Sequence, residues 1–284
     1  GVANIRGTLS GDGDLRFTDS DKNFIEPSGG DTSTHTGNVL VEQSSLTLGA
    51  GALANSATVT FRDNRTDRNN ISRTSVADAD SLKNGVNLTA NELTVGADSG
   101  IELTSKAKLR AQEATIAGDI SGTGTLIFNG GRESVIKDSG TTFTGTTQVI
   151  DRSTLTLETS GALGSSDILS IAGGATVNAR AGDVFNEDLH LWFQTGDNRL
   201  DIQGAQTVSH LTLPESSTIA FTSNSSNGND QLTLTSTTKE SVIRGDVSQN
   251  ASGDLILDGA KASLYSQTVS HLTLPESSTI AFTS

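Results

Sequence analysis

The sequence predicts an all-β chain wound into a three-faced β-solenoid, in which short parallel strands stack coil upon coil. Three observations predict this fold. Apolar residues alternate with polar ones in short runs, these runs recur roughly every 7–10 residues, and long blocks of sequence repeat with insertions between the copies. Together they indicate many short strands that are joined by tight corners into a repeating unit.

The short apolar runs have the period of β-strands. Leu46-Thr47-Leu48, Val59-Thr60-Phe61 and Leu93-Thr94-Val95 each place apolar side chains on alternate residues, as half-buried strands do. Gly, Asn, Asp and Ser fill the gaps between the runs, as expected for turns. No segment carries the apolar stripe of an amphipathic helix. We therefore expect strands along the whole chain.

The spacing of the runs sets the size of a coil. Between Leu93 and Phe128 the strand centres fall near residues 94, 102, 109, 116 and 126. Three such strands make a coil of roughly 20–25 residues, so the 284 residues correspond to about 12 coils. At about 4.8 Å per coil, the rod would be on the order of 60 Å long.

Internal repeats favour a solenoid over a closed barrel or a sandwich. Residues 9–17 align with 120–128, and Thr36-Gly37 aligns with Thr144-Gly145, so the offset between the copies drifts along the repeat. Because each coil pairs only with its neighbours, a solenoid accepts such insertions at its corners. We expect one domain over residues 1–284, with repeat blocks at roughly 7–61, 118–180 and 245–284 and a polar, Arg-containing insertion at 62–83.

One repeat is perfect. Gln206–Ser223 reappears without a change as Gln267–Ser284. The offset between the copies is close to three coils of about 20 residues. The repeat therefore fits a solenoid, and His210 and His271 are matching positions of the repeat and not a paired site.

The composition excludes several classes of function. The chain has no Cys, which removes disulfides, thiolate metal sites and catalytic thiols. Its net charge of −14 argues against nucleic-acid binding, which needs a basic surface. No apolar run approaches the ~20 residues of a membrane-spanning helix, and no segment has the pattern of a signal peptide. Since Met is absent as well, we expect an internal segment of a longer or processed protein.

Enzymatic activity is not expected, and no cofactor or metal ion is predicted. The four His lack the spacing of metal ligands, and Asp12 and Asp14 lack the Gly and Glu of an EF-hand loop. A polysaccharide-degrading β-helix enzyme would need two carboxylates on neighbouring coils of one face. Acidic residues are plentiful but scattered through turns, and one Trp cannot form a stacked platform for a glycan.

The first candidate binding feature is a cluster of four Arg in an otherwise acidic chain, Arg62, Arg65, Arg68 and Arg73. In the simpler interpretation these residues lie in a corner loop and pair with nearby carboxylates. In the functional interpretation they form a cationic patch for sulfated glycans or acidic partner surfaces, because guanidinium groups bind sulfate and carboxylate through two hydrogen bonds.

The second candidate is Trp192, which lies in the most apolar run of the chain. In a strand, Leu189, Leu191 and Phe193 would point into the coil, and His190 and Trp192 would point outward. Trp192 would then pack on the outer face or beneath a loop. An exposed Trp192 would instead be a contact anchor, because Trp is enriched at binding hot spots.

The repeat pattern resembles that of a known family. Residues 120–128 read Ile-Ser-Gly-x-Gly-x-Leu-x-Phe, and Phe143-Thr144-Gly145, Thr154–Leu157 and Gly161–Gly164 follow. This order of elements resembles the passenger-associated repeat of bacterial autotransporters, of the AIDA and antigen-43-like adhesin group. The likeness is strong over roughly residues 118–180 and fair over 7–61, where a longer insertion and Ala54 depart from the pattern.

The resemblance implies a right-handed parallel β-helix that is displayed outside a Gram-negative cell. Membrane contact would come only through a C-terminal barrel that this sequence lacks. The implied function is a non-enzymatic adhesin or autoaggregation rod that binds a host glycan or protein, or the same protein on another cell. The alternatives are a structural stalk that aids secretion without a ligand of its own, and a polysaccharide-degrading enzyme.

Overall fold

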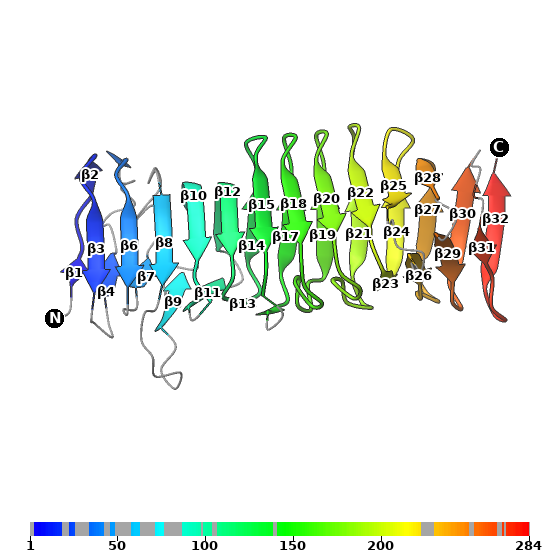
Figure 1. Cartoon of the computed structure of the whole chain (residues 1–284), viewed down its shortest axis with the longest axis horizontal. Helices are drawn as coiled ribbons and strands as arrows, with labels where there is room; N and C mark the ends of the chain where they lie inside the picture. Colours follow the sequence, from blue (N-terminus) through cyan, green and yellow to red (C-terminus); the bar gives the residue numbers. More distant parts are fainter. Residues whose placement is uncertain are drawn as a thin grey trace.

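The protein is a stack of short parallel strands (Figure 1). The computed structural model describes residues 3–18, 23–25, 34–42, 46–48, 58–62, 72–76, 87–97, 99–103, 107–138, 141–222, 230–249, 253–265, 269 and 271–283. Within these ranges every regular element is a β-strand, and all strand pairings are parallel. The predicted all-β parallel solenoid is confirmed.

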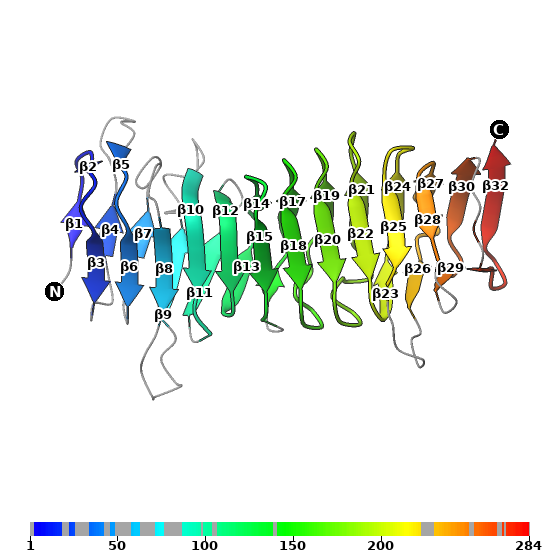
Figure 2. The same cartoon turned by 45° about the horizontal axis from the view of Figure 1, so that its top comes forward.

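Each coil runs along three sides of the stack. The side that we call face 1 is built by β10 (Asn87–Val95) and β12 (Lys108–Ile116) through their first halves, and then by β14 (Thr125–Phe128), β17 (Thr146–Val149), β19 (Ile168–Ile171), β21 (His190–Phe193), β24 (His210–Leu213), β27 (Glu240–Ile243), β30 (Lys261–Tyr265) and β32 (Thr279–Thr283). These strands follow one another along the rod in Figure 2.

Face 2 comes next in each coil. It is built by β3 (Leu15–Thr18), β6 (Val39–Glu42), β8 (Thr58–Arg62), the second halves of β10 and β12, and then by β15 (Glu133–Ile136), β18 (Thr154–Leu157), β20 (Thr176–Ala179), β22 (Arg199–Ile202), β25 (Thr218–Phe221) and β28 (Asp246–Ser248).

The third side is less regular, with turns in place of strands at residues 158–167 and 180–188. Its strands are β9 (Ser72–Val76), β11 (Ser99–Leu103), β13 (Asp119–Gly122), β16 (Thr142–Phe143), β23 (Ala205–Val208), β26 (Gln231–Leu234), β29 (Asp254–Leu257) and β31 (Leu272–Thr273). Near the N-terminus, β1 (Asn4–Ile5), β4 (Asn23–Ile25) and β7 (Leu46–Leu48) form one sheet, and β2 (Ser10–Gly11) pairs with β5 (Thr34–His35).

The coil count differs slightly from the expected 12, because the stack comprises about nine turns. The coils also vary in length more than a uniform repeat unit allows. The step from Lys108 to its partner Thr125 is short, whereas the step from Thr58 to its partner Glu92 is twice as long. Long corner segments therefore take up residues that a uniform coil length would assign to further turns.

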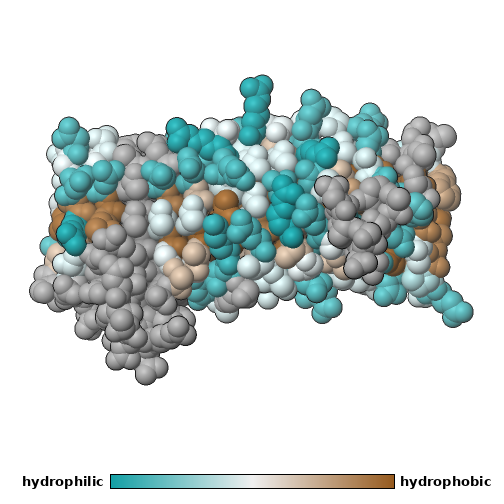
Figure 3. All heavy atoms as spheres, in the orientation of Figure 1, coloured by the Kyte–Doolittle hydropathy of each residue, from teal (hydrophilic) through white to brown (hydrophobic). Residues whose placement is uncertain are grey.

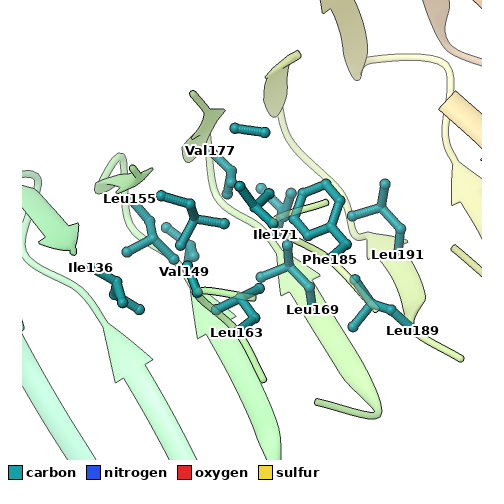
Figure 4. Close-up of a cluster of buried hydrophobic side chains, with 14 of the residues drawn as sticks. Ile136, Val149, Leu155, Leu163, Leu169, Ile171, Val177, Phe185, Leu189 and Leu191 are labelled. Atoms are coloured by element: carbon teal, nitrogen blue, oxygen red, sulfur yellow. The ribbon is translucent and has the colours of Figure 1, made fainter. Parts of the chain in front are cut away.

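Buried apolar side chains form a column along the axis of the stack, and Figure 4 shows the part of it from Ile136 to Leu191. On face 2 the inward side chains of successive coils are Leu155, Val177, Leu200 and Ile219, all fully buried. Burying a side chain of this size contributes roughly 1.5–3 kcal/mol to stability. Each of these coils therefore adds an apolar layer to the core.

Buried polar side chains hold the corners together. The Ser134 hydroxyl accepts a hydrogen bond from the Ala114 N–H at 2.9 Å. The Asn198 side-chain oxygen accepts from the Gly174 N–H at 3.0 Å, and both Ser134 and Asn198 are almost fully buried. These oxygens satisfy amide groups that a corner would otherwise leave buried without a partner.

The repeated Ser-Gly-x-Gly and Thr-Gly motifs form stacked corners. The Thr144 N–H donates to the Gly122 carbonyl oxygen at 2.9 Å, and a Cβ on Gly145 would overlap the carbonyl oxygen of Gly124. In the first copy, the Thr36 N–H donates to the Gly11 oxygen at 2.8 Å in the same way. The motif thus specifies a close contact between consecutive coils, and only Gly fits there.

The two copies of this corner lie on different edges of the solenoid. The first leads into β3, whose ladder continues through β8 to the second half of β10 on face 2. The second leads into β14, which pairs with the first half of β12 on face 1. The sequence repeat therefore defines a type of corner and does not fix the face that follows it.

The perfect repeat of Gln206–Ser223 is also rotated by one face. The first copy supplies β24 to face 1, whereas its counterpart β31 pairs with β29 on the third side. The physical reason is the long segment after β24, which delays the partner of Thr212 until Val242. Three coils from His210 therefore end at Thr279 and not at His271.

The two copies also differ in burial. Phe221 is 3% exposed, whereas Phe282, at the same place in the second copy, is 77% exposed in the last strand of face 1. Hydrophobic residues reach the surface at this end of the rod in Figure 3.

The stacked corner gives a stability prediction. Replacing Gly145→Ala should destabilise the fold by about 1–3 kcal/mol, because the added methyl group would overlap the backbone of the coil below. Gly182→Ala is the matched control, since its Cβ would meet the Ala205 oxygen at an ordinary 3.5 Å. Thermal unfolding followed by circular dichroism measures both, and an equal loss in the two variants would contradict the corner assignment.

Candidate functional site

The outward side chains of face 1 form two columns along the rod. One column runs through Thr146, Ile168, His190 and His210, and the other through Gln148, Ser170, Trp192 and Thr212. Strand β14 continues them with Thr125 and Ile127. We call these ten positions on β14, β17, β19, β21 and β24 the face-1 strip. None of them is Asp, Glu, Lys or Arg.

Charged side chains border the strip at both ends. Lys108 and Arg110 are exposed on β12, and Glu240 and Lys261 are exposed on β27 and β30. The outward columns of face 2 are different, because Glu133, Arg199, Asp201 and Asp246 lie among its Thr and Asn residues. In a chain of net charge −14, the strip is thus an uncharged surface across five consecutive strands.

Trp192 is the exposed aromatic residue of the strip. Its side chain is 40% exposed, while Leu189, Leu191 and Phe193 are buried in the core, as the alternation in the sequence predicts. In the described part of the chain, the other large exposed apolar side chains are Leu274 and Phe282 near the C-terminal end of the stack. Trp192 therefore offers apolar surface in the middle of the rod.

Two imidazole rings stack beside Trp192. His190 and His210 come from adjacent coils, with ring centroids 3.9 Å apart and planes 13° apart. The Trp192 ring lies 6.1 Å from that of His190 and only 12° from parallel. Because the two imidazoles stack from coil to coil, all three ring planes lie across the long axis of the rod.

Hydrogen bonds fix the imidazoles in this arrangement. The His190 Nε2 lies 3.1 Å from the Thr212 hydroxyl oxygen, one coil further along. The His210 Nδ1 lies 3.3 Å from the Ser209 hydroxyl oxygen. The cluster formed by His190, Trp192 and His210 is therefore tied to its own strands and to the next coil.

The imidazoles are uncharged at neutral pH. Burial lowers the pKa of His190 from 6.5 to about 4, helped by the nearby positive charges of His210 and Lys239. Burial and Lys239 also lower the pKa of His210. A protonated ring here would lose hydration and would face a like charge. The strip therefore carries no formal charge near pH 7.

The two sides of the Trp192 ring differ. On one side lies Ser170, which is 1% exposed and accepts a hydrogen bond from the Gln194 amide nitrogen at 2.7 Å. On the other side lies Thr212, which is half-buried and has a short side chain. Beyond Thr212, in the same column, lies Val242. Short side chains thus flank the ring, and Gln194 covers the Ser170 side.

The Arg cluster is mostly outside the described residues. Arg62 is the last residue of β8 and Arg73 lies in β9, on the next side of the coil. Arg65 and Arg68 lie outside the described ranges, as do the side chains of all four. The cationic patch therefore stays a prediction.

The outward side chains of face 2 form a polar ladder. The Thr156 hydroxyl donates to Glu133 at 3.1 Å and accepts from the Asn178 amide at 3.1 Å. In the next coil, Arg199 and Asp201 form an ion pair at 2.7 Å. Glu133, Thr156 and Asn178 are thus linked from coil to coil, and Arg199 pairs with Asp201 within one strand. No group of three or more His, Asp or Glu able to hold a metal ion occurs in the described part of the chain.

Comparison with known proteins gives no relative: no family model, no curated protein and no solved structure matches this chain. Among the described residues, no helix has the length and apolar character needed to cross a membrane. The site must therefore be interpreted from its own geometry.

Sequence reasoning placed His190 and Trp192 on the outer face but missed the stacking of His190 with His210. The relevant signal is the spacing of His190 and His210, which is one coil length. The sequence alone does not give the length of each coil, so the pairing register is needed to interpret this spacing. If the coil after His190 were as short as the one from Lys108 to Thr125, His210 would not be its register partner, and the two rings would lie apart.

The imidazole stack gives a pH prediction. A base whose pKa is lower in the folded state binds fewer protons there, so stability falls as the pH drops from about 6.5 towards 4. We expect the melting temperature to fall from pH 7 to pH 5, and to fall less in the His190→Gln/His210→Gln variant. Calorimetry at several pH values tests this, and equal slopes for both proteins would contradict it.

Proposed function

We propose that this chain is a segment of a non-enzymatic, surface-displayed rod that adheres through its coil faces. Its partner is a host glycan or protein, or the same protein on another cell. The observation that carries this proposal is the face-1 strip, an uncharged surface with an exposed Trp192 in a chain of net charge −14. An acidic rod of this kind repels acidic surfaces, and electrostatic repulsion of a partner is weakest at the uncharged strip.

The physical basis is repetition of weak contacts. Binding at charged positions requires the removal of water from ions, which is costly unless each charge gains a partner. The half-buried Thr, Gln148 and Ile168 side chains of the strip avoid that cost. Each contact contributes little, but a row of them along a rigid stack adds up, and many displayed rods give avidity.

Display on a Gram-negative cell is part of the same proposal. It is supported by the resemblance of residues 118–180 to the passenger repeats of autotransporters and by the absence of Cys, which suits passage through an oxidising periplasm. A solenoid also suits folding outside the membrane, since each coil can add to the one before it.

A structural stalk is the second candidate. The observation that favours it is the continuous apolar column with parallel pairing from coil to coil, which needs no ligand to be stable. A stalk would project another domain and hold the exported chain outside the cell.

Charge substitutions on the strip separate the two candidates. The variant Gln148→Glu/Ile168→Glu/Thr212→Glu adds three charges to face 1, and the control Thr154→Glu/Thr176→Glu/Thr218→Glu adds three to face 2 at the same net charge. In cells displaying the segment, we expect the first to reduce clumping or adhesion about tenfold, equivalent to ~1.4 kcal/mol, and the control to change it little.

Surface display is quantified with an antibody in every sample. Equal losses in both variants would contradict a role of the face-1 strip. Unchanged adhesion in both, at full display, would favour the stalk.

A further inference from the structure

Trp192 has one ring face turned towards a short residue, and the strand register defines what surrounds it. Thr212 pairs with Trp192 in the coil before it and with Val242 in the coil after it. Trp192 and Val242 are therefore two coils apart, about 9.6 Å between backbones at ~4.8 Å per coil. Thr212 forms the floor between them, and we call this place the Trp192 shelf.

The three side chains that border the shelf differ in kind. The Trp192 ring lies across the rod axis, so its flat face looks along the rod over Thr212. Val242 is half-buried and apolar on the opposite side. The Thr212 hydroxyl contributes polarity at the base, where it contacts His190 Nε2 at 3.1 Å. An apolar wall with a hydroxyl floor suits a ligand that has both apolar and hydroxyl surfaces.

The opposite ring face of Trp192 lacks such a space. Gln194 reaches back along that side and donates to Ser170, whose side chain is buried. The shelf is therefore confined to the Thr212 side, where it would accept one ring and not a continuous stack of rings.

The charges around the shelf balance. Lys239 lies close enough to His190 and His210 to lower the pKa of both, and Glu240, the next residue in the chain, is exposed and has the opposite charge. His190 and His210 are themselves neutral near pH 7. An acidic ligand would be repelled by the net charge of −14, and a cationic ligand would find carboxylates elsewhere on the rod. The local chemistry favours an uncharged ligand.

We propose that the Trp192 shelf is a subsite for one pyranose ring of an uncharged glycan, a proposal that rests on the adhesive function proposed above. The C–H face of the sugar packs on the indole ring, as apolar groups do on Trp, and its hydroxyl groups exchange hydrogen bonds with Thr212. His190 and His210 are positioning residues, because their stack holds Trp192 and Thr212 in place.

Fluorescence tests the proposal directly, because Trp192 is the sole Trp of the chain and all indole emission reports on the shelf. The uncharged probes are cellohexaose, chitohexaose and mannohexaose. An oligogalacturonate and a chitosan hexamer are the acidic and cationic probes. We expect a saturable change in emission with at least one uncharged probe, unchanged between about 50 and 500 mM salt.

Variants test whether the shelf is the binding place, with calorimetry as a readout that does not need Trp. Trp192→Ala should weaken binding at least about tenfold, or ~1.4 kcal/mol, and Trp192→Phe should retain part of it. Thr212→Gln should abolish binding by filling the shelf without adding charge. Thr218→Gln is the matched control, an outward half-buried Thr on face 2, and should bind as the parent does.

Three results would overturn the proposal: no response to any uncharged hexasaccharide, binding that persists in Trp192→Ala, or binding restricted to a charged probe and lost in salt. The adhesion of cells displaying the face-1 charge variants is measured independently. If adhesion depends on the strip while no hexasaccharide binds, the subsite fails and the adhesive function stands.

Discussion

The structure depends on the backbone hydrogen bonds that pair each coil with the next in a fixed parallel register. Every other feature follows from this pairing. It brings inward residues such as Leu155 and Val177 into one apolar column, and it brings Gly145 so close to the coil below that a side chain has no room. A shift of one residue would turn the core outward, because side chains alternate along a strand.

The same register creates the surface on which the proposed function rests. His190 and His210 belong to successive coils, yet their rings are 3.9 Å apart, and Trp192 and Val242 border the same shelf from coils that are not adjacent. None of these side chains would have this meaning alone. Residues that are one coil length apart in the sequence become neighbours on one face of the solenoid. The uncharged strip of face 1 is formed in this way.

Alternation and corner motifs were enough to predict the strands, the parallel stack and the inward positions of Leu189, Leu191 and Phe193, because these depend on local geometry. The length of each coil, and with it the face on which each segment lies, could not be predicted. The step from Thr212 to Val242 is longer than the coil before it, and this single long segment rotates the second copy of the perfect repeat onto another face. The strip and the imidazole stack depend on these coil lengths, so Trp192 was the one residue of the strip that the sequence identified as a binding candidate. The Arg62–Arg73 prediction lies largely outside the described residues.

Cross-linking between coils tests the central claim most directly, and the absence of Cys makes the background clean. Thr154 and Thr176 are register partners on face 2, so Thr154→Cys/Thr176→Cys should oxidise to an intramolecular disulfide, whose Cα atoms must lie within about 4.4–6.8 Å. Thr154→Cys/Asn178→Cys places the second thiol two positions out of register and should remain reduced under the same conditions. Efficient bridging of the second pair and not the first would contradict the parallel register on which the stack, the strip and the shelf depend.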